Sequence, residues 1–204
     1  SGFGDRVPDA TLPGYDLIIQ GESGMMNITG DTDTPPFKMG TSIADLVSGM
    51  TLVQGILAAL YIRRDTGKGQ HVKVSMLEAL SSLLTYHAGN YFATGVSSER
   101  RGNAHPSIVP YETFQAADGW LNIAVGNDAQ WDTFCKAVDR LDLLEHELYA
   151  NAPDRVSNRD QLIPIVTELL QTKSRDEWIA ILSGAGIPCG AIRTVGEACE
   201  SETL

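Results

Sequence analysis

One long apolar segment constrains the fold of this chain more than any other feature. Between Ser42 and Asp65 the sequence SIADLVSGMTLVQGILAALYIRRD repeats large apolar residues three and four positions apart, which is the spacing of a helix. We expect a largely buried helix over residues 42–62. Ser42 and Asp45 have the spacing of a capping box, so the expected role of Asp45 is to cap this helix. Such a helix needs other elements packed around it.

The segments on either side of this helix alternate between two periodicities. Residues 17–28 have helical spacing after Pro13, HVKVSM at 71–76 alternates as a strand does, and residues 76–95 return to helical spacing. The order helix, turn, strand, helix is typical of an α/β fold.

The chain changes character after the loop GVSSERRGNAHPSIVP. Asp118-Gly119 lies between two short strand patterns and predicts a hairpin, and PCGAIRTV predicts a final strand. Three amphipathic helices are expected over 128–138, 158–172 and 174–184. We therefore predict an α/β fold in two domains, of which the second is smaller and has a short antiparallel sheet. The predicted division is a first domain at 1–96, a linker at 97–104, the small domain at 105–194 and a tail at 195–204.

Composition excludes several classes of protein. The 204 residues include 15 basic and 26 acidic side chains, a net charge of -11 that disfavours nucleic-acid binding. No apolar run approaches the length of a membrane span, and no basic segment precedes an apolar one at the start, so we expect neither a membrane protein nor a secreted one. The three cysteines have no CxxC spacing, which predicts reduced thiols in a cytoplasmic protein and no metal site.

The segment TGDTDTPPFKMG at 29–40 sets a carboxylate in a rigid bend. Gly30 permits a positive φ, and Pro35 and Pro36 fix theirs, so Asp33 is expected in an irregular turn between two helices, facing a cleft. A rigid bend can hold a nucleophile. Taken alone, such a segment is more often a solvated turn, and both interpretations stay open at this point. A calcium loop is excluded because the Gly and Glu of an EF-hand do not follow.

Two histidines are weaker candidates. His105, in the loop before a proline, has the chemistry of a base or an amide-contacting group, although a lone loop histidine is usually just exposed. His87 falls among apolar residues of a predicted helix and is interpreted as a core or interface residue. Local chemistry alone leaves the function open.

The combination of segments is more specific. SGFG, PGYD, SGMMNITGDTDTPP, GILAALYIRRDTGKGQHVKVSM, RRGNAHPSIVPYETF, DGWLNIAVGNDAQW and GIPCGAI occur in the order and approximate spacing of the class III CoA-transferases. The chain resembles this family, which includes formyl-CoA transferase and carnitine CoA-transferase, over essentially its whole length. The resemblance implies that residues 1–96 form part of the large CoA-transferase domain. It comes from recognition of these motifs and not from composition or periodicity.

The resemblance implies a covalent mechanism. The nucleophilic aspartate of the family follows a Thr-Gly or Asn-Gly pair by three residues, which here is Asp33 after Thr29-Gly30. Its carboxylate would attack an acyl-CoA to give an anhydride and then an aspartyl-CoA thioester, from which a small carboxylic acid takes the CoA. No metal is required. Carboxylates are weak nucleophiles, so reactivity would come from positioning and the exclusion of water.

The same resemblance assigns residues to coenzyme A. Ser1 and Phe3, in SGFG, would lie near the thioester end of CoA. The loop GNAHPSIVPY, with Asn103 and His105, occupies the place of the glycine-rich loop that shields the intermediates in formyl-CoA transferase. The segment TGDTDTPP followed by KMG looks most like members that act on small dicarboxylates such as succinate.

Members of the family are intertwined dimers and are longer than this chain. The resemblance therefore implies a fragment or a natural truncation, which would bind CoA weakly by itself and form at least a homodimer. One alternative is a catalytically silent remnant that only self-associates. Another is an α-methylacyl-CoA racemase, in which Asp45 fits the catalytic aspartate. Tyr15, however, stands where that enzyme has its histidine, and a tyrosine hydroxyl is a poor base at neutral pH.

Overall fold

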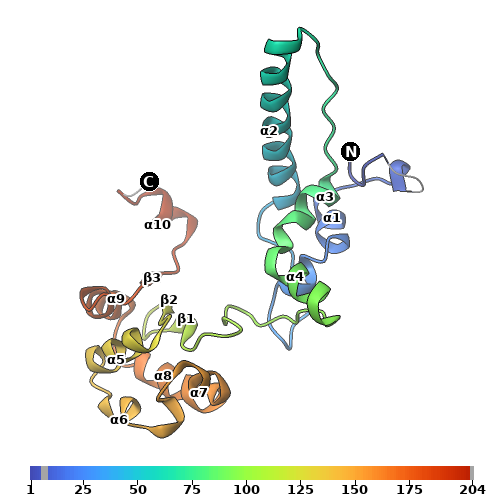
Figure 1. The fold of residues 1–204 in the computed structure, drawn as a ribbon. Helices are drawn as coiled ribbons and strands as arrows, with labels where there is room; N and C mark the ends of the chain where they lie inside the picture. The colour runs from blue at the N-terminus through green and yellow to red at the C-terminus, as the bar shows by residue number, and fades with distance from the viewer. Residues whose placement is uncertain (6–8, 203–204) are drawn as a thin grey trace. The chain divides into compact units, whose positions relative to one another are not determined.

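The structure, a computed structural model, describes residues 1–5 and 9–202. Contacts within the chain divide it into two compact units, Ser1–Gly102 and Asn103–Leu204, which we describe separately (Figure 1). The finer division into 1–96, 97–104, 105–194 and 195–204 stays a prediction.

The first unit consists of helices. Their bounds are η1 Asp9–Thr11, α1 Asp16–Glu22, η2 Met26–Ile28, α2 Ile43–Thr66, α3 Met76–Ser81, η3 Ser82–Leu84 and α4 Thr85–Thr94. The predicted strand at 71–76 is wrong. This stretch is extended and runs back beside α2, but no strand pairs with it among the described residues (Figure 1). Alternation gives a segment two faces, whereas a strand also needs a partner backbone. Gly55 lets the stretch approach the helix, because a Cβ there would lie 2.7 Å from Val72 Cγ1.

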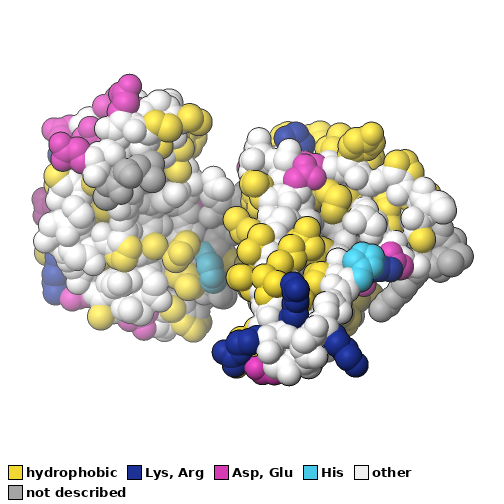
Figure 2. All heavy atoms as spheres, turned by 90° about the horizontal axis from the view of Figure 1, so that it is seen from above, with side chains coloured by type: hydrophobic (Ala, Val, Ile, Leu, Met, Phe, Trp, Pro, Cys, Tyr) yellow, Lys and Arg dark blue, Asp and Glu magenta, His cyan; other side chains and the backbone are white. Residues whose placement is uncertain are grey.

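The long helix forms as predicted, but the expectation that it is largely buried is wrong. α2 ends at Thr66, where Gly67 takes a left-handed φ of 69°. Within the described chain only Ala44 of this helix is buried, because apolar side chains surround the helix while α1 and α3 contact only one end of it (Figure 1). Hydrophobic side chains accordingly gather on the surface of the first unit (Figure 2).

The start of α2 is capped from a different helix. The Ser42 side chain makes no capping hydrogen bond, and Asp45 is exposed, so the predicted capping box is wrong. Instead, Asp16 Oδ1 on α1 accepts the backbone N–H of Ala44 at 2.9 Å. A carboxylate from another helix therefore satisfies one of the free N–H groups at the start of α2.

α2 also has the length and composition of a membrane span. It has 24 residues, a mean hydropathy of 1.7 over its most apolar window, and only 6% of that window buried. The expectation that no apolar run approaches spanning length is therefore wrong. Core helices of soluble proteins pass the same test, so this single helix is weak evidence for a membrane.

The second unit confirms the predicted mixed α/β class. β1 Tyr111–Gln115, β2 Trp120–Ala124 and β3 Cys189–Ala191 form an antiparallel sheet in the order β1-β2-β3. The hairpin is confirmed, with Phe114 opposite Leu121 and the Ala116 N–H donating to the Gly119 carbonyl at 2.8 Å. β2 pairs with β1 and β3.

Helices α5 Asp128–Ala137, α8 Arg159–Leu170 and α9 Arg175–Gly184 of the second unit pack on one face of this sheet. Further helices of this unit are α6 Leu141–Leu144, η4 Glu147–Tyr149, α7 Ala152–Ser157 and α10 Val195–Cys199. α5, α8 and α9 confirm the three predicted helices. Their buried side chains meet alternate residues of β1 and β2 in a core that includes Phe114, Leu121, Ile123, Trp131, Phe134, Leu162, Val166, Trp178 and Leu182. The core of the first unit is smaller and consists of Ile19, Met25, Ala44 and Leu80.

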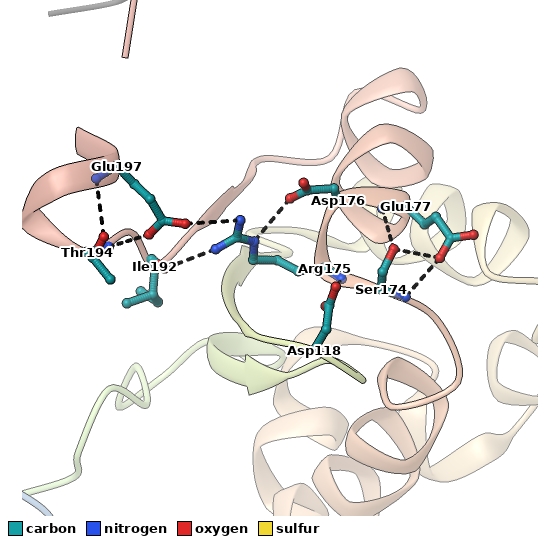
Figure 3. Close-up of polar contacts among 8 residues, drawn as sticks. All are labelled: Asp118, Ser174, Arg175, Asp176, Glu177, Ile192, Thr194 and Glu197. Carbon is teal, nitrogen blue, oxygen red and sulfur yellow. Dashed lines mark hydrogen bonds and ion pairs between the residues drawn. The ribbon is translucent and has the colours of Figure 1, made fainter. Parts of the chain in front are cut away.

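A polar network ties α10 to α9 (Figure 3). Ser174 and Glu177 form a capping box at the start of α9. The next side chain, Arg175, donates to the Ile192 carbonyl at 3.4 Å and lies 3.7 Å from the Glu197 carboxylate on α10. Arg175 therefore connects α10 to α9.

The three cysteines are free, as the sequence predicts, and differ in exposure. Burial raises the pKa of the Cys135 thiol to about 12 and also raises the pKa of the half-buried Cys189. Cys199, on α10, is exposed.

Candidate active site

The bend at residues 29–37 is confirmed as irregular backbone between η2 and α2. Gly30 has a φ of 118°, and a Cβ on it would lie 2.9 Å from the Phe37 ring, so only glycine fits there. The Phe37 N–H donates to the Thr29 carbonyl at 3.0 Å and closes the bend. A tight turn within it is closed by the Thr34 N–H, which donates to the Asp31 carbonyl at 3.2 Å.

The two carboxylates of this bend have different surroundings. Asp31 Oδ1 accepts the Thr32 N–H at 2.7 Å, and its backbone N–H donates to Thr34 Oγ1 at 3.0 Å. Asp31 therefore builds the turn. Asp33 lies between Thr32 and Thr34 in the turn and is exposed. No hydrogen bond or ion pair reaches its carboxylate from the described residues. The two carboxylates thus differ in that only Asp31 has hydrogen-bond partners within the turn.

A second segment of the same unit holds the bend. Arg100 Nε donates to the Asp31 carbonyl at 3.2 Å, and the Gly102 N–H donates to the Gly30 carbonyl at 2.9 Å. Thr32 Oγ1 also donates to the Arg100 carbonyl at 3.4 Å. The stretch just before Asp33, residues 30–32, is thus held by residues about seventy positions away in the chain. Whether its carboxylate faces a cleft stays a prediction.

A polar pair on α1 holds the backbone that follows the bend. Gln20 is fully buried, and its Oε1 accepts the Met39 N–H at 2.8 Å while its Nε2 donates to Asp16 Oδ2 at 2.8 Å. Asp16 in turn caps α2. We missed both residues in the sequence. Their i, i+4 spacing on a helix with few polar residues was the available signal.

Ser1 and Phe3 lie in the same unit as Asp33, beside the start of α3. The Ser1 and Gly2 carbonyls accept the N–H groups of Met76 and Leu77 at 2.9 and 3.0 Å. Phe3 packs against the small core, whereas Ser1 lines a cavity of about 540 Å³ with His71 and Lys73. Lys73 also pairs with Asp5, whose carboxyl pKa is lowered by that hydrogen bond. Among the described residues no hydrogen bond joins Ser1 or Phe3 to Asp33.

Asn103 and His105 belong to the second unit. Asn103 is exposed and lines a cavity of about 500 Å³ over the sheet with Tyr111, Asn122 and Cys189. His105 is half-buried, its Nδ1 accepts the Ser107 N–H at 3.2 Å, and its ring lies 5.1 Å from that of Tyr111. These two residues share a loop, and their relation to Asp33 stays a prediction.

Other candidates have structural surroundings. His87 is half-buried, with Nδ1 at 2.9 Å from Ser98 Oγ. Tyr15 precedes α1 and is 76% exposed, and Asp45 is exposed on the first turn of α2. Over residues 1–5 and 9–202 no group of three or more His, Cys, Asp or Glu side chains is arranged to hold a metal ion.

Three kinds of comparison point to one family. The sequence profile of CoA-transferase family III matches residues 1–204. The chain is 39% identical over 198 residues to a succinate–glutarate CoA-transferase of Agrobacterium fabrum, covering 97% of this chain and 49% of that protein. It is 37% identical to an acetyl-CoA:oxalate CoA-transferase of Acetobacter aceti, covering 97% of this chain and 51% of that protein.

A solved structure of a CAIB/BAIF family protein from Brucella suis has the same fold. It superposes with a TM-score of 0.91 at 38% identity and covers all of this chain and 54% of that one. The chain thus spans about half the length of the curated relatives that it matches. Because the profile match extends over its whole length and the seven motifs lie on the fold described above, the chain belongs to CoA-transferase family III.

Proposed function

We propose that this protein transfers coenzyme A between an acyl-CoA and a small carboxylic acid, with Asp33 as the covalent nucleophile. The observation that carries the proposal is the contrast within the bend. Asp31 is committed to building the turn, whereas the exposed Asp33 carboxylate has no partner among the described residues. A nucleophile needs a fixed backbone and free oxygen atoms, and Asp33 combines them.

The reaction proceeds in four acyl-transfer steps. An Asp33 oxygen attacks the thioester carbonyl, the C–S bond breaks, and an anhydride and CoA thiolate form. The thiolate attacks the Asp33 carbonyl and releases the first acid, which leaves an aspartyl-CoA thioester. The acceptor carboxylate then attacks that thioester, giving a second anhydride and thiolate. Attack of the thiolate on the acceptor's acyl carbon forms the new acyl-CoA and restores Asp33. No metal takes part in this scheme.

The relatives suggest the class of acid. Their names pair succinate with glutarate and acetyl-CoA with oxalate, and three of these acids, succinate, glutarate and oxalate, are small dicarboxylates. We propose substrates of this class for the present protein as well. Ser1, Phe3, Asn103 and His105 are the proposed contacts to CoA. A cytoplasmic location is part of the same proposal.

Trapping of the intermediate tests the nucleophile. The full-length protein is incubated with succinyl-CoA and quenched with hydroxylamine, and mass spectrometry locates the modified residue. We expect the adduct on Asp33. Asp33→Ala should lose transfer to glutarate by several orders of magnitude, because no neighbouring group replaces a covalent nucleophile.

Asp45→Ala is the comparison that separates the mechanisms. It removes an exposed carboxylate that the racemase alternative needs and the transferase does not. Transfer should therefore survive in Asp45→Ala. An adduct on Asp31 or Asp45, or an unchanged rate in Asp33→Ala, would contradict the assignment.

A further inference from the structure

Two arginines of the second unit hold one loop by its backbone carbonyls. The loop, which we call the anchored loop, is His105–Val109. Arg155, on α7, donates from Nε to the Val109 carbonyl at 3.1 Å. Arg159, on α8, donates from one terminal nitrogen to the carbonyls of His105 and, at 3.4 Å, Ile108. The two side chains come from consecutive helices, α7 and α8, and reach carbonyls of the same loop.

Arg155 is a fixed anchor. Its side chain is 1% exposed, and it also donates to the Tyr149 carbonyl at 3.1 Å and pairs with Asp128 at 2.6 Å. The Trp131 ring lies 5.2 Å from the guanidinium carbon. A buried arginine whose donors are used in this way cannot move without leaving several polar groups unpaired.

Arg159 has fewer partners than Arg155, and two of them are carbonyls of the anchored loop. Besides the two loop carbonyls, its guanidinium lies 3.6 Å from the carboxylate of Glu112, on β1. Both side chains of that pair are mostly buried, at 21% and 15% exposed. Arg159 therefore joins the loop to the sheet as well as to α8.

The loop itself fixes the orientation of His105. The His105 N–H donates to the Tyr111 carbonyl at 2.9 Å, and the Ser107 N–H donates to His105 Nδ1 at 3.2 Å. In the neutral ring this second bond leaves the proton on Nε2, so the ring presents an N–H donor. The direction of that donor depends on the carbonyl and amide positions that Arg159 helps to hold.

We propose that Arg159 is a positioning residue for acyl-CoA, which keeps the anchored loop in one conformation and so sets the direction of the His105 Nε2–H donor. The inference rests on the proposed function, because it takes the loop to contact the substrate. It makes the loop a fixed wall of the binding site. A loop without such anchors would have to become ordered each time that substrate binds.

The test replaces Arg159 without leaving an unpaired buried carboxylate. Arg159→Met and Arg159→Lys are each made in a Glu112→Gln background, and that background alone is the reference. Arg140→Met in the same background is the matched control. Arg140 pairs with Asp142 at 2.7 Å. Among the described residues, its side chain makes no hydrogen bond or ion pair with the anchored loop. Hydrogen exchange of the amides in 103–111 reports the loop directly and needs no activity.

We expect these amides to exchange about tenfold faster in Arg159→Met, since the hydrogen bonds of a charged donor are lost. In Arg159→Lys the exchange rate should lie between those of the reference and Arg159→Met, because one ammonium replaces part of the contacts. The Arg140 variant should exchange at the rate of the reference. In steady-state assays KM for acyl-CoA should rise about tenfold in Arg159→Met with kcat little changed, and lysine should restore part of it. A purely structural role would lower the amount of active enzyme without this split.

The outcomes separate the two proposals. Unchanged loop exchange in Arg159→Met overturns the anchoring, even if transferase activity is present. Faster exchange with an unchanged KM overturns the role in substrate binding. Absence of any transfer by the unmodified full-length protein overturns the proposed function and this role with it, while the exchange data still decide whether Arg159 holds the loop.

Discussion

The environment of each carboxylate decides its chemistry in this chain. Asp31 and Asp33 differ by two positions, yet one closes a turn and the other has free oxygen atoms. Asp16 caps a helix that starts nearly thirty residues later. Glu112 is mostly buried, and its Oε1 accepts no hydrogen bond from the described residues. The same functional group therefore has different roles in this chain because its surroundings differ.

Glu112 makes stability depend on pH. Burial raises the pKa of its carboxyl, and the nearby Arg159 lowers the pKa by a smaller amount. Since the pKa is raised on folding, the stabilising contribution of Glu112 is present below its unfolded pKa and is lost as pH rises through the folded pKa. We therefore expect Glu112→Gln to gain stability relative to the unmodified protein over the pH range that starts at the ordinary glutamate pKa, about 4.3, and extends upward through the raised folded pKa.

Urea denaturation of both proteins across that range measures the difference. The two free energies of unfolding should diverge in favour of the glutamine variant as pH rises. If the unmodified protein gains instead, Arg159 holds Glu112 ionised and the direction of the pKa shift is wrong.

At the scale of elements, anchoring often comes from a single side chain. α10 has five residues, too few to be stable alone, and Arg175 connects it to α9 (Figure 3). Ion pairs that water reaches contribute little to stability. The attachment of α10 is therefore weak enough to be changed by one substitution.

We expect Arg175→Met to loosen α10. Amide hydrogen exchange in the peptide 192–202 should become up to about fivefold faster. Lys136→Met is the control, because Lys136 pairs with Asp132 within α5. Equal exchange in the two variants would show that other contacts hold α10.

The sequence predicted most elements but not their attachments. Helical periodicity was sufficient for α2, α5, α8 and α9, and Asp118-Gly119 was sufficient for the hairpin. α6 and α7 were missed because four to six residues are too few to show a period. The cap from Asp16 and the two arginines on the anchored loop depend on partners far away in the chain, which no local pattern contains. Motif resemblance, and not chemistry, selected Asp33.

At the scale of the whole chain, a net charge of -11 accompanies a large exposed apolar surface. The exposed side chains of α2 include Met50, Val53, Leu57, Leu60 and Tyr61. Monomeric proteins rarely leave contiguous apolar areas of this kind open to water. We therefore expect another protein surface to cover the apolar side chains of α2.

We predict that the 204-residue chain self-associates in solution through α2. Light scattering should give a mass of at least a dimer. Val53→Lys with Leu57→Lys should shift it towards the monomer, because two charges would be buried without partners. Gln171→Lys, at an exposed position of the other unit, should leave the mass unchanged. A monomer at high concentration would contradict the prediction and the self-association alternative with it.

The unequal burial of the cysteines gives the chain a natural attachment point for a fluorophore. Thiolate is the form that maleimides alkylate, and burial disfavours it at Cys135 and Cys189, whereas the Cys199 side chain is exposed and accessible to a dye. Dye would thus collect on α10, the helix that Arg175 holds. The wild-type sequence therefore carries its own reporter of that attachment, readable as fluorescence anisotropy without an engineered cysteine.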